Sequence, residues 1–260
     1  MPDFTDDLAL ARRLADLADA ISLARFRATD LVVETKPDLT PVSDADRAVE
    51  RELRDELARA RPDDAVSGEE LGSAGSGARR WVLDPIDGTK NYVRGVPVWA
   101  TLVALLDGDD AVVGVVSAPA LGRRWWAARG LGAFGTTLGG EPTRLAVSRV
   151  AQLADASMSY SSLGGWRERG VDLEAVTAQL WRSRAYGDFW SHMLVAEGAV
   201  DIAAEPELSL WDMAALAPIV VEAGGRFTAV DGRSWVHGDS AATSNGLLHD
   251  ALLAALRPQH

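Results

Sequence analysis

The chain has 260 residues, 47% of them hydrophobic and 25% charged, which is typical of one large or two modest globular domains. Its net charge of −12 argues against non-specific nucleic-acid binding, and the absence of cysteine excludes disulfides, thiol catalysis and zinc–thiolate sites. An acidic N-terminus and the lack of any run of about 18 apolar residues predict neither a signal peptide nor a membrane span, so we expect a cytoplasmic protein.

The first part of the chain predicts two amphipathic helices that are separated by a strand and a loop. Residues 5–27 carry apolar side chains at helical spacing. A strand is expected at 31–33, and the two prolines within 36–41 predict a loop. Ser43 is a favourable N-cap for the second helix and places Asp46 at its third position.

The run from Trp81 to Asn91 is the most informative part of the sequence. A strand-like segment stops at Asp84, and Asp87 follows after Pro85 and Ile86. We expect both carboxylates on one tight turn, where they repel each other unless a cation lies between them, and a divalent cation is the usual partner. For either aspartate alone, an ordinary surface turn is the alternative, because Asp, Pro and Gly all favour turns.

Beyond this run the pattern predicts a mixture of strands and helices. Two β-rich runs between 96 and 126 are separated by a hairpin signal at 107–110. Further elements are expected as helices near 172–182, 188–198, 209–223 and 246–256 and a strand at 200–203. The neighbours Trp125 and Trp126 would point to opposite faces of a strand, which suggests that one of them lies at a subunit interface.

The order of these elements predicts an α/β or α+β layered protein. A slight change of composition within 144–153 suggests a boundary between an N-terminal α+β part, residues 1–148, and a C-terminal α/β part, residues 149–260. The first part carries most of the candidate metal ligands. The second carries Asp212 and the candidate substrate-selecting residues.

Four separated motifs resemble, in their order, those of the inositol monophosphatase superfamily. They are Lys36-Pro37-Asp38-Leu39-Thr40-Pro41-Val42-Ser43-Asp44-Ala45-Asp46, Gly68-Glu69-Glu70, Asp84-Pro85-Ile86-Asp87-Gly88-Thr89, and Trp211-Asp212 followed by Glu222-Ala223-Gly224-Gly225. The resemblance spans residues 5–256. Stretches at 94–100, 124–130, 184–189 and 197–206 resemble the bacterial histidinol-phosphate phosphatase branch of that superfamily. The resemblance implies a sandwich of alternating α-β-α-β-α layers and a homodimer.

The resemblance also implies a magnesium site with two or three ions. Its ligands would be Glu69, Asp84, Asp87, Asp212 and the backbone carbonyl of Ile86, with Asp84 bridging two ions. Hard oxygen ligands are those that Mg²⁺ requires. Each acid also has an ordinary explanation when it is taken alone, as a surface charge or a charge at a helix N-terminus.

The implied reaction is hydrolysis of a phosphomonoester by a water molecule that the metal activates. In the family pattern, the amides of Gly88 and Thr89 bind the phosphate, while Thr89 and Asp46 orient and deprotonate the water. Enzymes that form an aspartyl-phosphate use Asp-x-Asp-Gly-Thr, with one residue between the aspartates. Here two residues separate Asp84 from Asp87, so we expect no phosphoenzyme.

Three further acids are candidates for contact with the rest of the substrate. Asp188 suits the ammonium group of L-histidinol phosphate better than a neutral polyol, although it could be a simple helix N-cap. Glu205 lies where inositol phosphatases also keep a glutamate, so it does not discriminate between substrates, and Asp44 is a third candidate.

The leading interpretation is therefore a histidinol-phosphate phosphatase of histidine biosynthesis. Two alternatives stay open at this stage. One is an inositol-1-phosphate or broad-specificity sugar phosphatase of the same fold. The other is a regulatory metal-binding protein that has kept the fold and lost catalysis.

Overall fold

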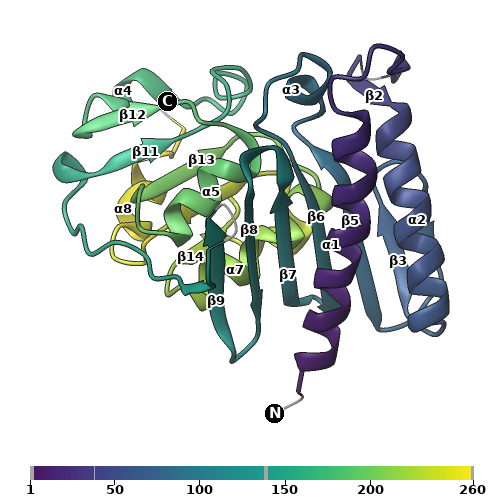
Figure 1. Ribbon diagram of the computed structural model, residues 1–260. Coiled ribbons are helices and arrows are strands. Elements are labelled where there is room, and N and C mark those ends of the chain that lie inside the picture. The colour runs from purple at the N-terminus through teal and green to yellow at the C-terminus, as the bar shows by residue number, and fades with distance from the viewer. Residues whose placement is uncertain (1–2, 38, 138–139, 259–260) are drawn as a thin grey trace.

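Five layers alternate between helices and sheets (Figure 1). The computed structural model describes residues 3–37, 39–137 and 140–258, so Asp38 of the first motif lies outside the described residues. α1 (Thr5–Arg25) and α2 (Asp44–Ala60) cover the outer face of an eight-stranded sheet. The helices between that sheet and a five-stranded sheet are α5 (Asp188–Ala196), α6 (Leu210–Ala214) and α7 (Leu216–Glu222). The outer face of the second sheet shares a core with α4 (Leu173–Thr177) and α8 (His249–Ala255), so the predicted layered α/β sandwich is confirmed.

The eight-stranded sheet has the order β10-β9-β8-β7-β6-β5-β3-β4. Its strands are β3 (Ala65–Gly68), β4 (Gly72–Ala74), β5 (Arg79–Asp87), β6 (Ala100–Asp107), β7 (Asp110–Ala118), β8 (Arg123–Ala128), β9 (Gly132–Thr137) and β10 (Thr143–Arg144). Only the pairing of β3 with β5 is parallel among the described strands of this sheet. The hairpin predicted at 107–110 joins β6 to β7. The second predicted β-rich run comprises β7 and the start of β8, with a 3₁₀ turn at Pro119–Leu121 between them.

The five-stranded sheet has the order β12-β11-β13-β15-β14. Its strands are β11 (Ser157–Ser159), β12 (Arg182–Arg184), β13 (Ile202–Glu205), β14 (Arg226–Thr228) and β15 (Ala241–Ser244). A separate two-stranded sheet pairs β1 (Val33–Thr35) with β2 (Pro41–Ser43), so the loop predicted at 36–41 ends in a short strand. Both faces of each large sheet are covered, which explains why so many strand residues are apolar without interruption.

The two neighbouring tryptophans illustrate this two-sided burial. Trp125 packs in the cluster shared with α5 and α7, and Trp126 packs in the cluster shared with α1, so they do point to opposite faces. Their exposed fractions are 0% and 5% within the single chain. The suggestion that one of them lies at a subunit interface is therefore wrong, because the helices of this same chain cover both.

The helix predicted over 209–223 is divided into α6 and α7 at Ala215. Pro218 contributes to this division, because proline has no N–H to donate to the carbonyl of the residue four positions earlier. The helix predicted near 172–182 is also shorter than expected, since it ends at Thr177, and strand β12 begins at residue 182. Within the described residues, no helix is both long and apolar enough to cross a membrane.

The division suggested at residue 148 separates the strands of the two sheets. One core cluster nevertheless joins Leu102 and Val116 of the first part to Phe189 and Met213 of the second. That the two parts form separate domains stays a prediction.

Candidate active site

Asp84 and Asp87 lie near the C-terminal end of β5, an inner strand of the first sheet. It does not end at Asp84, because pairing with β6 resumes at Asp87 opposite Ala100 after an irregularity between the two aspartates. Pro85 cannot donate a ladder hydrogen bond, and its carbonyl accepts one from the Thr101 hydroxyl at 2.8 Å. The expected turn therefore lies after Asp87, at Gly88, and the two carboxylates belong to an irregular strand.

Three carboxylates meet at this end of β5. Oxygen atoms of Asp84, Asp87 and Asp212 all lie within 4.8 Å of one another. Asp212 comes from α6, where its Oδ2 accepts a hydrogen bond from the Ser209 amide at 2.6 Å. Asp84 is 1% exposed, and its Oδ1 is buried without a hydrogen-bond partner among the described residues. An unpartnered buried oxygen within a group of acids fits an oxygen-coordinated divalent cation.

The electrostatics of these carboxylates favour a positive charge between them. Burial, followed by the charges of Glu69, Asp87 and Asp212, raises the pKa of Asp84 well above its ordinary value. Burial also raises the pKa of Asp212 to about 7, against a lowering effect of its hydrogen bond from Ser209. A bound cation would lower these pKa values by favouring the ionised forms.

Glu69 lies beside this group and is paired with a lysine. Its Oε1 is 2.7 Å from Nζ of Lys36, which also lies 2.5 Å from Oε1 of Glu70. The charge of Glu69 contributes to the raised pKa values of Asp84 and Asp212, so it acts on the same group. Lys36 was not predicted as a site residue, although it begins the first quoted motif.

Thr89 connects the Ile86 carbonyl to a buried acid. Its hydroxyl lies 2.9 Å from the Ile86 oxygen and 3.4 Å from Oδ1 of Asp46. The other carboxylate oxygen of Asp46 accepts from the Ser43 amide at 2.8 Å and the Ser43 hydroxyl at 2.6 Å, which confirms the predicted cap of α2. Burial raises the pKa of Asp46, against the lowering effect of its hydrogen bonds from Ser43.

Gly88 makes the turn into the short helix α3 (Thr89–Val93) with a φ of 80°. A side chain there would be strained, and its Cβ would lie 3.0 Å from the Val98 carbonyl oxygen. The amides of Gly88 and Thr89 stand at the start of this helix, where N–H groups have no intrahelical acceptor.

Asp188 lies against this loop and is the first residue of α5. Its φ of 49° is unusual for a residue other than glycine, and the N-cap of the helix is Gly187. The helix N-cap alternative for Asp188 is therefore wrong. Its Oδ2 accepts a hydrogen bond from Nδ2 of Asn91 at 3.0 Å, and burial raises its pKa.

Hydrogen bonds connect Asp188 to two other site residues. Its amide donates to Oγ of Ser161 at 2.7 Å, and that hydroxyl donates to Oε1 of Glu205 at 2.7 Å. The next amide, of Phe189, donates to Oδ2 of Asp87 at 2.8 Å. Asn91 and Ser161 were missed, because a single amide or hydroxyl in a sequence carries no signal of the acid that it contacts.

Asp44 is not brought into this group. Its Oδ2 forms an ion pair of 2.7 Å with Arg25 of α1, and its side chain is 39% exposed. This ion pair neither supports nor contradicts the expected contact of Asp44 with substrate, which stays a prediction.

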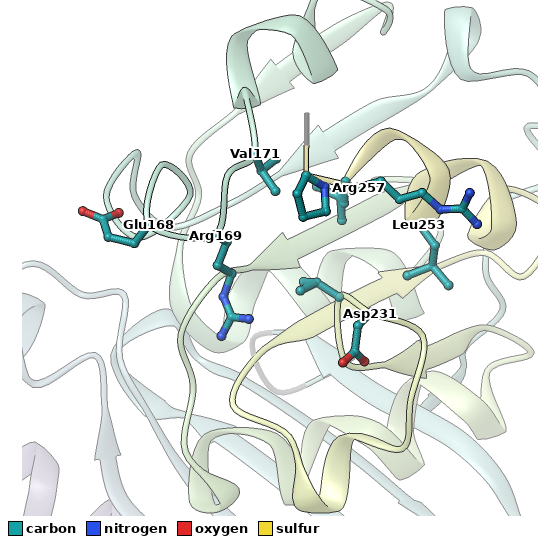
Figure 2. Close-up of a pocket in the computed structure, with 9 residues that line it drawn as sticks. Glu168, Arg169, Val171, Asp231, Leu253 and Arg257 are labelled. Carbon is teal, nitrogen blue, oxygen red and sulfur yellow. The ribbon is translucent and has the colours of Figure 1, made fainter. Parts of the chain in front are cut away.

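A cavity of about 530 Å³ lies elsewhere, between α8 and the loops at 168–171 and 230–231 (Figure 2). Its walls are Glu168, Arg169, Val171, Val230, Asp231, Leu253, Leu256, Arg257 and Pro258. Arg169 is paired with Asp239, and Asp231 is paired with Arg233. None of the carboxylates described above lines this cavity, so its size does not make it the site of the chemistry.

We expect the metal-free protein to lose stability as the pH rises from about 4.5 to about 8. Burial raises the pKa of Glu205 from 4.5 to about 8, so the folded protein keeps a proton that the unfolded chain releases at lower pH. Thermal unfolding in EDTA across this range measures the loss.

The variant Glu205→Gln should show a weaker dependence on pH, because it removes this titrating group. Glu168→Gln, which changes an exposed carboxylate, is the matched control. The same pH dependence in Glu205→Gln as in the wild type would contradict the expectation.

Comparison with known proteins agrees with the geometry. The family model described as the inositol monophosphatase family matches residues 5–260. A Streptomyces coelicolor protein named histidinol-phosphatase is 61% identical over 100% of both chains, and a Mycobacterium tuberculosis protein of the same name is 60% identical over 96% of this chain and 98% of its own. The solved structure of a Thermotoga maritima IMPase matches with a TM-score of 0.86 and 31% identity over 97% of each chain. The chain therefore belongs to the inositol monophosphatase family and is a phosphoric monoester hydrolase.

Proposed function

We propose that this enzyme is a Mg²⁺-dependent phosphatase that hydrolyses L-histidinol phosphate to L-histidinol and phosphate in histidine biosynthesis. The observation that carries the proposal is the position of Asp188. Its carboxylate lies close enough to Asp87 to raise the pKa of that acid. The amide of the next residue, Phe189, donates a hydrogen bond to Asp87, which holds the start of α5 beside the group of Asp84, Asp87 and Asp212. The histidinol-phosphatases of Streptomyces coelicolor and Mycobacterium tuberculosis, at 61% and 60% identity, support the same substrate.

The residues that would hold Mg²⁺ are Glu69, Asp84, Asp87, Asp212 and the carbonyl of Ile86. The unpartnered Oδ1 of Asp84 and the closeness of the three aspartates support a bound cation here, and the family resemblance implies two or three ions. When bound, Mg²⁺ would polarise the phosphoryl group and lower the pKa of the attacking water. Oε1 of Glu69 also forms an ion pair with Nζ of Lys36, at 2.7 Å.

Thr89 and Asp46 would take the proton of the attacking water. The Thr89 hydroxyl lies between the Ile86 carbonyl and Asp46, so it can turn its hydrogen toward Asp46 and accept a hydrogen bond from water. The raised pKa of Asp46 makes it a stronger base than an exposed aspartate. Because water is the nucleophile, no phosphoenzyme forms.

The phosphate would be bound by the amides of Gly88 and Thr89. Both belong to the turn into α3, whose positive φ at Gly88 suits glycine, and amides at a helix start favour an anion. The leaving alcohol would then extend toward Asp188 and Glu205. A carboxylate at Asp188 attracts the ammonium of histidinol. The homodimeric state and the cytoplasmic location stay predictions.

An inositol-phosphate or sugar phosphatase is the second candidate, and one observation favours it. Burial raises the pKa of Glu205 to about 8, which favours the protonated carboxyl, and a protonated carboxyl can donate a hydrogen bond to a neutral hydroxyl. A Mycobacterium bovis protein named inositol-1-monophosphatase is 35% identical over 92% of this chain. Glu205 alone therefore does not decide between the two substrates.

The variant Asp87→Asn should abolish turnover and leave the fold intact. The substitution removes one ligand charge from a group that already repels itself, so the free energy of unfolding in EDTA should not decrease. Phosphate release from histidinol phosphate with Mg²⁺ and with EDTA measures the first effect, and thermal unfolding measures the second. Phosphate release by the wild type in EDTA, or normal activity of Asp87→Asn, would overturn the metal assignment.

The variant Asp188→Asn should raise KM for histidinol phosphate about tenfold and change KM for inositol phosphate little. A charge-assisted hydrogen bond contributes about 1.5–3 kcal/mol, and only the ammonium substrate uses this charge. Asparagine is preferred to alanine for this test because it tolerates a positive φ and can still accept the hydrogen bond from Asn91.

Glu205→Gln is the matched comparison, and it should affect both substrates. The two substrates are compared by kcat/KM for all three proteins. Equal losses on both substrates in Asp188→Asn would count against an ammonium contact, and comparable wild-type efficiencies would count against specificity for histidinol phosphate.

A further inference from the structure

A buried acid on α2 holds the loop that carries Glu69. Glu50 is 0% exposed, and its two carboxylate oxygens accept hydrogen bonds from backbone amides of this loop. Oε2 accepts from the Glu70 amide at 2.7 Å, and Oε1 accepts from the Leu71 amide at 3.1 Å. These are the two amides that directly follow Glu69.

Arg54, one turn further along α2, completes the contact. Its Nε donates to Oε1 of Glu50 at 2.8 Å, and its terminal nitrogen donates to the Gly72 carbonyl. Glu50 and Arg54 together therefore bind the loop backbone through two N–H groups and one carbonyl. The guanidinium also balances the charge of Glu50, so this acid adds little to the repulsion among the metal-site carboxylates.

Gly68 leaves the room that Glu50 needs. A Cβ at position 68 would lie 2.1 Å from Oε1 and 2.4 Å from Cδ of Glu50, well inside van der Waals contact. The backbone of Glu69 is also held by strand β5, on the side away from Glu50, since the Glu69 amide donates to the Leu83 carbonyl at 3.2 Å. The Glu69 backbone is thus fixed between β5, which carries Asp84, and α2.

We infer that Glu50 is a positioning residue for the metal ligand Glu69. Its two amide contacts fix the loop backbone, while Lys36 contacts only the carboxylates at the loop surface. The inference rests on the proposed function, in which Glu69 binds Mg²⁺. Outer contacts of this kind orient a ligand, and their loss usually weakens metal affinity by about 10- to 100-fold.

The test is the variant Glu50→Gln in the full chain. Glutamine has one acceptor oxygen for three donors, and its NH₂ group would face an N–H. We expect the Kd for Mg²⁺, measured by calorimetry without substrate, to rise about tenfold. Hydrogen exchange of the Glu70 and Leu71 amides should accelerate by a similar factor in EDTA, while kcat at saturating Mg²⁺ changes by less than about threefold.

A second variant covers the case in which Glu50→Gln fails to fold. Gly68→Ala keeps every charge but places a methyl group where the Glu50 carboxylate lies, so the same two readouts should change in the same direction. The control is Glu56→Gln on the same helix, whose carboxylate pairs with Arg59 instead of the loop. It should leave both readouts unchanged.

Two results would overturn the inference. One is an unchanged Kd for Mg²⁺ in a folded Glu50→Gln or Gly68→Ala variant, even if its thermal midpoint falls. The other is a weaker Kd without faster exchange at Glu70 and Leu71. Glu69→Gln separates these from failure of the proposed function: if that variant binds Mg²⁺ as the wild type does, Glu69 is not a ligand, whatever the exchange rates show.

Discussion

The repulsion among Asp84, Asp87 and Asp212 is the constraint on which the rest of the site depends. Three carboxylates with oxygen atoms within 4.8 Å of one another are unfavourable in a buried place, and here they are held there by three different devices. An irregular strand presents the first two, the Ser209 amide fixes the third, and the Phe189 amide contacts Asp87. Packing of the surrounding fold thus holds the three carboxylates together against their repulsion, in a position where a cation can neutralise them.

That arrangement also explains why the two sheets are built around one shared core. Asp84 and Asp87 belong to the first sheet, whereas Asp212 and Asp188 come from the helices between the sheets. If these helices could move freely against β5, repulsion would separate the acids. The apolar cluster that joins β6 and β7 to α5, α6 and α7 resists this movement.

Much of this could be predicted from the sequence, because the acids lie in motifs with fixed spacing and Ser43 forms a recognisable helix cap. The position of the turn after Asp84 could not be predicted. An Asp-Pro pair usually ends a strand, and only the tertiary pairing with Ala100 extends β5 to Asp87. The split of the 209–223 helix was missed for a different reason, since its apolar pattern continues across Ala215 although Pro218 within the range is a sequence signal of a break.

Glu50 shows a deeper limit of sequence reasoning. A glutamate four residues before an arginine on an amphipathic helix is typical of a solvent-exposed ion pair, yet here both side chains turn toward a loop that follows β3. Asp44 was expected to line the pocket beside Asp46, and the structure shows its ion pair with Arg25, so its contact with substrate stays a prediction. Neither partner is close in sequence, so no local pattern could have revealed it.

Because Asp188 is the proposed contact for the ammonium group of the substrate, its positive φ has a consequence for how substrate preference can change during evolution. Few residue types occupy this backbone region without strain, and asparagine and glycine are the main ones besides aspartate. Each is one nucleotide change away from an aspartate codon, and each would remove the charge without disturbing the helix start. The reacting end of the site would stay untouched by such a change. A lineage could therefore drift between cationic and neutral alcohols through a single backbone-compatible position, while most other replacements there would first have to overcome a conformational penalty.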